Sequence, residues 1–257
     1  MVIINGEISS ECNIVLDSGF YYGRGVFETI LVKNRPVFLK QHCERLKRGL
    51  EKLGVVNEAG EVYIKECVRK YDIHDCVLKV VATEKNTVVI TRDITYKPED
   101  YLRGFCVKLS SLRRNPFSHI TGLKSLNYTD NIIEKEQAMR EGYDEVIFLN
   151  TQNELAEGSM SNLFFVKEGI IYTPDKTCGI LNGIVREWVL ENFEVNEGKY
   201  TLEALLGADE VFITNSIMGI MKVKAIENTK IYGEDKIYKL VRHRYEKEIS
   251  IFETAQI

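Results

Sequence analysis

Two short stretches of this chain carry side chains that could do chemistry together. In residues 122–128, Gly-Leu-Lys-Ser-Leu-Asn-Tyr, Lys124 stands just ahead of a helical pattern. In residues 157–163, Glu-Gly-Ser-Met-Ser-Asn-Leu, Glu157 opens a turn rich in glycine, serine and asparagine. A lysine held away from water has a lowered pKa, so it can attack an aldehyde and then carry a proton. One stretch therefore offers an amine and the other a carboxylate.

An amine and a carboxylate of this kind are the two groups that a pyridoxal phosphate enzyme requires. The amine forms the Schiff base, and the carboxylate is the partner of the protonated ring nitrogen. Each residue also has a plain structural interpretation, because Lys124 can be an ordinary solvated lysine and Glu157 an ordinary turn carboxylate. These two residues alone leave both interpretations open.

Length and composition indicate a globular protein with one large domain or two of ordinary size. The chain has 257 residues, of which 44% are apolar and 28% charged. Its formal net charge of −4 argues against a nucleic-acid surface, which requires a basic patch. No run of about eighteen apolar residues and no signal segment is present, so we expect a cytoplasmic protein that does not bind membranes.

The cysteines and glycines do not form the usual metal or nucleotide motifs. The six cysteines fall in no CxxC pair and in no Cys/His zinc spacing, so we expect reduced, mostly buried thiols and no metal site. Neither a G-x-G-x-x-G motif nor a P-loop is present.

Strand and helix patterns change in character near residue 110. Before it, short strands alternate with helices: we predict a hairpin at Asn5-Gly6, a second hairpin whose return strand is 37–39, helices over 39–53 and 59–70, and strands over 76–82 and 87–91. Residues 110–121 are polar and contain a proline, as interdomain linkers do. After them we predict a helix over 126–141, a series of strands, and a final helix over 236–252.

Taken together, these motifs resemble those of the class IV aminotransferase family, the fold type IV pyridoxal phosphate enzymes. Matching stretches occur in the family's order, from residues 4–6 through 124–128 and 157–164 to 214–216. The resemblance implies an α+β, two-domain fold like that of D-amino-acid aminotransferase. In this fold a small N-terminal α/β domain (1–112) and a linker (113–121) precede a larger, β-rich pseudo-barrel domain (122–257) that binds the cofactor.

The resemblance also implies partners and cofactor-binding residues. The expected cofactor is pyridoxal 5′-phosphate, the substrate a small molecule with an amino group, and the assembly a homodimer. Lys124 is the catalytic lysine and also binds the cofactor, Glu157 faces the ring nitrogen, and Tyr128 lies near the 3′-oxygen. Arg45, in a stretch that matches the family's H-x-x-R-L pattern, binds the phosphate with its rigid donor fork.

Two further segments are expected to complete the phosphate site. Residues 179–186 resemble the family's L-P-G-I-T-R segment, in which the amides of Ile184 and Val185 open a helix and face the phosphate. Asn182 replaces the usual proline there. Ser216 corresponds by position to a hydroxyl residue that binds the phosphate together with the next amide, that of Ile217.

The substrate side departs from the family pattern. Residues 22–29 resemble the family's first motif, which makes Tyr22 and Thr29 candidate substrate residues. Relatives commonly carry an Arg-Gly-rich loop where this chain has Ala-Thr-Glu-Lys-Asn-Thr (82–87). Either Arg92, Arg113 or Arg114 takes over the binding of the substrate anion, or the substrate differs. Lys79, on a predicted strand, is a further candidate.

Three functions remain open at this stage. The first is the family's lyase activity, which converts 4-amino-4-deoxychorismate to 4-aminobenzoate and pyruvate. The second is transamination of branched-chain or D-amino acids, and the third is cofactor or partner binding without catalysis. Residues 215–218, Asn-Ser-Ile-Met, and 77–81, Val-Leu-Lys-Val-Val, resemble the lyase branch and favour the first. Because Lys124, Glu157 and Arg45 are all present, the third is disfavoured.

Overall fold

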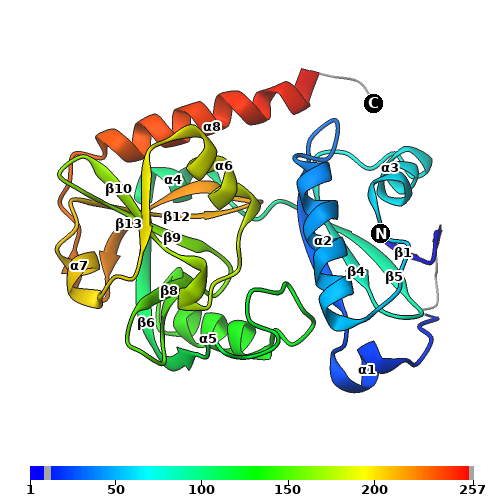
Figure 1. The fold of residues 1–257 in the computed structure, drawn as a ribbon. Coiled ribbons are helices and arrows are strands. Elements are labelled where there is room, and N and C mark those ends of the chain that lie inside the picture. The colour runs from blue at the N-terminus through cyan, green and yellow to red at the C-terminus, as the bar shows by residue number, and fades with distance from the viewer. Residues whose placement is uncertain (9–12, 255–257) are drawn as a thin grey trace. The chain divides into compact units, whose positions relative to one another are not determined.

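The computed structural model describes residues 1–8 and 13–254. Contacts between Cα atoms divide the chain into two compact units (Figure 1). The first comprises Met1–Thr95, Leu123–Tyr128 and Glu248–Ile257, and the second comprises Tyr96–Gly122 and Thr129–Lys247. The short segment that contains Lys124 therefore belongs to the first unit, although the residues on both sides of it in the chain belong to the second.

The first unit is built on an antiparallel sheet with the strand order β2-β1-β5-β4-β3. Its strands are β1 (Val2–Ile4), β2 (Glu7–Ile8), β3 (Val26–Val32), β4 (Cys76–Ala82) and β5 (Thr87–Arg92). The predicted first hairpin is present, and both Asn5 and Gly6 at its turn have positive φ, as its two-residue turn requires.

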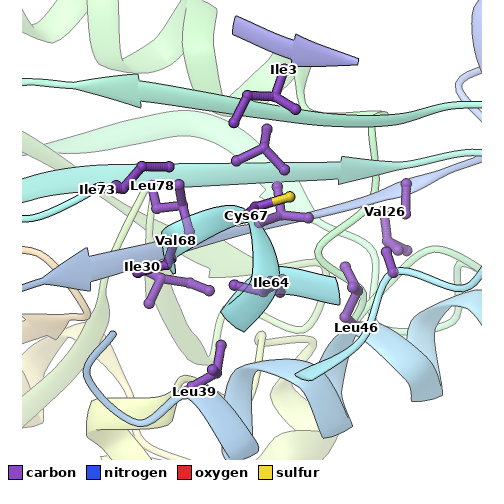
Figure 2. Close-up of a cluster of buried hydrophobic side chains, with 14 of the residues drawn as sticks. Ile3, Val26, Ile30, Leu39, Leu46, Ile64, Cys67, Val68, Ile73 and Leu78 are labelled. Carbon is purple, nitrogen blue, oxygen red and sulfur yellow. The ribbon is translucent and has the colours of Figure 1, made fainter. Parts of the chain in front are cut away.

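One face of this sheet packs against two helices (Figure 2). The helices of the unit are α1 (Ser18–Tyr22), α2 (Leu39–Leu53) and α3 (Glu61–Lys70). Because side chains alternate along a strand, Val26 and Ile30 of β3 point to the same face. There they join Leu46 of α2 and Ile64 of α3 in a buried apolar cluster. Phe27 and Thr29, which alternate with them along the strand, belong to the opposite face.

The prediction of a strand over residues 37–39 was wrong. The chain leaves β3 through a tight turn closed by a bridge between Val32 and Pro36, and α2 already begins at Leu39. Phe38 adopts the left-handed conformation with a φ of 52° at the start of this helix. A short apolar run fits either a strand or the start of an amphipathic helix. Here the helix is favoured, because it buries an apolar stripe that includes Leu39 and Leu46.

The second unit contains a larger, curled sheet with the strand order β11-β10-β9-β12-β13-β6-β7-β8, on which β14 pairs with β13. Most neighbours are antiparallel, whereas the β10–β11, β13–β6 and β6–β7 pairs are parallel. Its strands are β6 (Phe105–Arg114), β7 (Glu145–Asn150), β8 (Leu155–Gly158), β9 (Asn162–Lys167), β10 (Ile170–Pro174), β11 (Val195–Gly198), β12 (Glu210–Asn215), β13 (Gly219–Ile226) and β14 (Thr229–Lys230).

Helices pack on this sheet and at its margins. They are α4 (Pro98–Arg103), α5 (Thr129–Arg140), the 3₁₀ turn η1 (Lys176–Cys178), α6 (Ile184–Asn192), α7 (Leu202–Leu206) and α8 (Lys236–Thr254), whose residues from Glu248 onward are grouped with the first unit. The predicted strands and helices of this half of the chain are largely present. The helix expected from residue 126 begins at Thr129, because Ser125 forms a bridge with Val26 of β3 and the Leu126 amide donates to the Gly25 carbonyl.

The expected linker is partly a strand. Arg113 and Arg114 are the last residues of β6, where they lie opposite Leu149 and Asn150 of β7. Pairing with β7 satisfies their backbone although their side chains are polar. The predicted domain boundaries at residues 112 and 121 stay a prediction.

The turn between β4 and β5 holds the segment before α1. The carboxylate of Asp17, which is only 5% exposed, accepts hydrogen bonds from the Thr83 hydroxyl at 2.6 Å and the Lys85 amide at 2.9 Å. It also accepts from two amides at the start of α1, which it caps. Burial would raise the pKa of Asp17, but these hydrogen bonds lower it below its usual value. This turn therefore has a structural task in this chain.

Replacing Asp17 with alanine should lower the free energy of unfolding by about 1–3 kcal/mol, because it leaves buried donors of the turn and of α1 unpaired. Asp93→Ala, at an exposed position just after β5, is the matched control and should change it by no more than about 0.5 kcal/mol. Urea unfolding of both variants measures the difference. Equal effects would show that the Asp17 contacts do not stabilise the unit.

Candidate active site

In the first unit, Lys124 lies against aromatic rings. Its Nζ is 4.6 Å from the centroid of the Phe27 ring and 5.4 Å from that of Tyr128, and these two rings meet edge to face. The backbone explains this placement: the Phe27 amide donates to the Lys124 carbonyl at 2.8 Å, and the Leu126 amide donates to Gly25 at 3.0 Å. The amine is thus held, half-buried, beside the start of β3.

Candidate substrate residues share the Phe27 face of the sheet. Thr29 lies directly opposite Lys79 of β4, and the Nζ of Lys79 is 4.6 Å from the Phe27 ring centroid. Arg92 of β5 faces the same way, because it lies opposite the residue two before Lys79. Burial lowers the pKa of Lys79, and the nearby charge of Arg92 lowers it further. This face therefore presents an amine and a guanidinium to an anion.

Tyr22 is placed differently from these residues. It is the last residue of α1, it is 77% exposed, and its described ring contact is with Tyr21. Its assignment as a substrate residue stays a prediction.

Arg45 is engaged by an acidic residue that the sequence did not single out. Its Nε and Nη2 donate to the two oxygens of Glu28, both at 2.7 Å, and the Nδ1 of His42 lies 2.6 Å from Glu28 Oε2. The side chains of Glu28 and His42 are each 1% exposed and that of Arg45 is 10% exposed. The sequence places Arg45 off the apolar stripe of α2, but it does not reveal this partner on β3.

Charge and burial set the protonation of this cluster. Burial alone would raise the pKa of Glu28, but the positive charge of Arg45 and the hydrogen bonds from Arg45 and His42 hold it well below its usual range. Burial lowers the pKa of His42, against the opposing effect of Glu28. Glu28 is therefore ionised, and His42 is a neutral imidazole whose Nδ1 carries the donated hydrogen.

In the second unit, Glu157 is held beside a cation. Its Oε2 accepts a hydrogen bond from the Leu181 amide at 2.8 Å, and its Oε1 is 3.6 Å from Nη2 of Arg114. Both side chains are mostly buried, and the guanidinium of Arg114 lies 3.9 Å from the centroid of the Phe148 ring. The carboxylate thus lies beside a positive charge, and a carboxylate oxygen can accept a hydrogen bond from a protonated ring nitrogen.

Arg114 is therefore spatially tied to Glu157. Its Nη1 donates to Asn131 at 3.1 Å, whereas its Nε and Nη2 are buried without a hydrogen-bond partner among the described residues. Arg113 donates to the Ser110 carbonyl. Of the three arginines proposed to replace the missing loop, Arg92 is the one on the face that carries Lys79.

The segment just before α6 is hydrogen-bonded to the turn that follows Glu157. Asn162 donates to the Leu181 carbonyl at 2.7 Å. A side chain at position 183 would place its Cβ 2.0 Å from Asn162 Oδ1, so only glycine fits where Gly183 lies. The backbone amides of Ile184 and Val185 follow at the first turn, where a helix leaves its N–H groups without intrahelical partners.

Asn182, which replaces the usual proline, is fixed by its side chain. Its Oδ1 accepts from Arg186 at 2.9 Å, and its Nδ2 donates to Glu187. Arg186 is fully buried and also donates to Glu197 and to the Pro174 carbonyl. Side-chain hydrogen bonds thus supply rigidity that proline would supply through its ring.

The segment after β12 is already hydrogen-bonded to its own asparagine. Asn215 Oδ1 accepts from the amides of Ile217 at 2.9 Å and Met218 at 2.8 Å, and its Nδ2 donates to the Met160 carbonyl at 3.1 Å. A phosphate that used the Ile217 amide would therefore have to share its hydrogen with Asn215. Ser216 lies between these residues and is partly exposed.

Other kinds of site find no support in the part of the chain that the structure describes. No group of His, Cys, Asp and Glu there could hold a metal ion, and no helix there is long and apolar enough to cross a membrane. Cys12 lies outside the described residues, and the other five cysteines are free thiols. Burial raises the pKa of Cys43 to about 12 and that of Cys178 to about 11, which disfavours the reactive thiolate form of both.

Comparisons with known proteins identify the family to which this chain is similar. A family model described as "Amino-transferase class IV" matches residues 25–226. The aminodeoxychorismate lyase of Bacillus subtilis is 34% identical, with 97% of this chain and 94% of that protein covered. A protein of Aquifex aeolicus named as a probable branched-chain-amino-acid aminotransferase is 31% identical, with 84% and 80% covered.

A solved structure has a similar fold. The T.th. branched-chain amino acid aminotransferase with pyridoxamine 5′-phosphate superposes with a TM-score of 0.85 at 25% identity and covers 96% of this chain and 92% of its own. The predicted α+β fold class and the predicted family resemblance are thereby confirmed.

The pKa shifts of Glu28 and His42 predict how stability depends on pH. Both groups have a lower pKa in the folded state, so the unfolded chain binds more protons as the pH falls, first below the ordinary value of 6.5 for His42 and then below 4.5 for Glu28. The stabilisation is present in full above these values. Below 6.5, His42 should lower the free energy of unfolding by up to about 1.4 kcal/mol per pH unit.

Urea unfolding between about pH 8 and pH 5 measures this slope. The His42→Asn variant, whose side chain does not titrate, should show a shallower slope than the wild type. Equal slopes for the two proteins would contradict a lowered pKa of His42.

Proposed function

Because the chain belongs to the class IV aminotransferase family, we propose that it is a pyridoxal phosphate enzyme that converts 4-amino-4-deoxychorismate to 4-aminobenzoate and pyruvate. The observation that carries this proposal is the 34% identity to the aminodeoxychorismate lyase of Bacillus subtilis across almost the full length of both proteins. The family, and the solved relative with pyridoxamine 5′-phosphate, identify pyridoxal 5′-phosphate as the cofactor.

The residues present fit this cofactor. Lys124 offers a half-buried amine beside two aromatic rings, and Glu157 offers a carboxylate beside the Arg114 guanidinium. In this proposal Lys124 bonds the aldehyde carbon, Glu157 accepts a hydrogen bond from the ring nitrogen, and Tyr128 lies near the 3′-oxygen. The proposed phosphate ligands are the Arg45 guanidinium, the amides of Ile184 and Val185, the hydroxyl of Ser216 and the amide of Ile217.

When bound, pyridoxal phosphate supplies an electron-withdrawing ring that stabilises negative charge next to the substrate amine. The chain's own residues do the rest. The Nζ of Lys124 takes a proton from the substrate and returns it. Phe27 and Tyr128 shield that amine from water, and Glu157, which lies beside the Arg114 guanidinium, would accept a hydrogen bond from the protonated ring nitrogen.

On the substrate side, the proposal rests on one face of the first unit's sheet. Lys79 and Arg92 provide positive charge for a substrate carboxylate, and Thr29 adds a hydroxyl directly opposite Lys79. Tyr22 is assigned to the substrate pocket by its position in the first motif. A dicarboxylate such as 4-amino-4-deoxychorismate suits a site with two cations.

Transamination is the second candidate function. The observation that favours it is the 31% identity to a protein of Aquifex aeolicus named as a probable branched-chain-amino-acid aminotransferase. A transaminase would use the same residues to hold the cofactor, so only the substrate side distinguishes the two reactions.

We also propose that the enzyme acts as a homodimer. The segment around α1 exposes several large apolar side chains, and a cluster of this kind is typical of a protein interface. Phe20 is 65% exposed, Tyr21 59% and Leu16 54%. The cytoplasmic location predicted from the sequence is retained as part of the proposal.

Replacing Lys124 with alanine should abolish the visible absorbance band that the wild-type protein acquires with pyridoxal phosphate, because no amine remains to bond the aldehyde. The rate of the catalysed reaction should fall on the order of a thousand-fold or more. Lys85→Ala, at an exposed lysine, is the control and should keep both. A band that survives in full in Lys124→Ala would remove the basis of the proposal.

Product analysis separates the two functions. The wild-type protein with pyridoxal phosphate should release 4-aminobenzoate and pyruvate in equal amounts from 4-amino-4-deoxychorismate, and it should leave D-alanine, or L-leucine with 2-oxoglutarate, unchanged. Conversion of either amino acid to its keto acid, without release of 4-aminobenzoate, would instead establish the transaminase.

A further inference from the structure

Two residues of the family-like stretches have no role in the function described so far. Glu28 belongs to the first motif, residues 22–29, and His42 opens the H-x-x-R-L pattern that contains Arg45. The structure brings both of them onto Arg45. We propose that Glu28 and His42 are positioning residues that aim the Arg45 guanidinium at the 5′-phosphate of the cofactor; this inference rests on the proposed function.

The geometry of the contact fixes the guanidinium. Nε and Nη2 of Arg45 lie on one edge of the planar group, and each donates to a different oxygen of Glu28 at 2.7 Å. Two parallel hydrogen bonds to one carboxylate define both the position and the plane of an arginine. The opposite edge, with Nη1 and the second hydrogen of Nη2, therefore has a fixed direction away from Glu28, as a phosphate ligand requires.

Glu28 is itself held within the sheet. It lies in the middle of β3, opposite Val80 of β4, and its side chain is 1% exposed. The residue before it, Phe27, donates its amide to the Lys124 carbonyl. Neighbouring residues of one strand thus hold the backbone of the proposed Schiff-base lysine and the side chain of the proposed phosphate ligand.

His42 completes the clamp from α2. Its Nδ1 donates to Glu28 Oε2, the oxygen that also accepts from Nη2 of Arg45. His42 and Arg45 are one turn apart on α2, so a single carboxylate accepts hydrogen bonds from two side chains of the same helix face. A neutral imidazole can hold Glu28 without adding a positive charge near Lys124. The charge of Lys124 itself contributes to the lowered pKa of His42.

A purely structural role makes a different prediction. If the ion pair only held α2 against β3, its loss would weaken folding without discriminating between ligands that have a phosphate and ligands that lack one. Pyridoxal has the same ring and aldehyde as pyridoxal phosphate but no phosphate group. The ratio of the two affinities therefore isolates the orientation of Arg45.

The experiment measures the dissociation constants of pyridoxal phosphate and pyridoxal for the cofactor-free protein, by titration of the visible absorbance band. In Glu28→Gln, the constant for pyridoxal phosphate should rise about ten-fold or more, while that for pyridoxal should change less than about two-fold. Arg45→Met should show the same selectivity to a larger extent. Equal weakening of both ligands, or no change in either, would overturn the inference.

A second pair of variants keeps the test decisive if Glu28→Gln folds poorly. His42→Asn retains an N–H donor near the position of Nδ1 and should keep the wild-type affinity ratio, whereas His42→Ala should lose part of the selectivity for pyridoxal phosphate. Equal ratios for the two variants would contradict the role of His42.

The same titrations separate this inference from the proposed function. Wild-type protein that forms no band with either ligand would overturn both. A wild-type band that depends on Lys124, together with an unchanged affinity ratio in Glu28→Gln, would overturn the positioning role alone.

Discussion

The chemistry of the first unit depends on the alternation of side chains along β3. Phe27 points to one face of the sheet, where it meets Lys124, Tyr128 and Lys79. Glu28 points to the helix-covered face and meets Arg45 there. Because the period of a strand is two, a shift of register by one residue would exchange these faces and separate every one of the contacts. Three antiparallel strands that pair along their full length prevent such a shift.

A second constraint acts in the other unit, where hydrogen bonds tie the glutamate turn to the start of α6. Glu157 binds the amide of Leu181, and Asn162 binds its carbonyl. The proposed partner of the ring nitrogen and the proposed phosphate-binding amides are therefore held by one short peptide segment. Only glycine is small enough to follow, because Asn162 fills the space that a side chain at Gly183 would need.

The sequence predicts the parts of this arrangement that are local. Lys124, Glu157 and the start of α6 lie within short motifs, where neighbouring residues largely determine the backbone. The partners of Arg45 and Glu157 were missed because they are distant: Glu28 and Arg114 come from other elements, and only the folded sheet brings them near. The strand predicted over residues 37–39 failed for a related reason, since burial against the sheet favoured a helix over an equally apolar strand.

The same reasoning limits where substrate recognition can reside. The turn between β4 and β5 cannot act as a free substrate loop, because Thr83 and the Lys85 amide are bound to Asp17 and Gly19 packs against Thr83 with no room for a Cβ. In the proposed function, positive charge for a substrate carboxylate comes from the strands instead. Lys79 and Arg92 are the residues proposed for this role, and they lie on the face that also carries Phe27. A lyase and a transaminase that share every cofactor ligand would therefore differ in which substrates this sheet face binds. Because burial lowers the pKa of Lys79, a substrate with its own negative charge would favour the protonated amine and bind best.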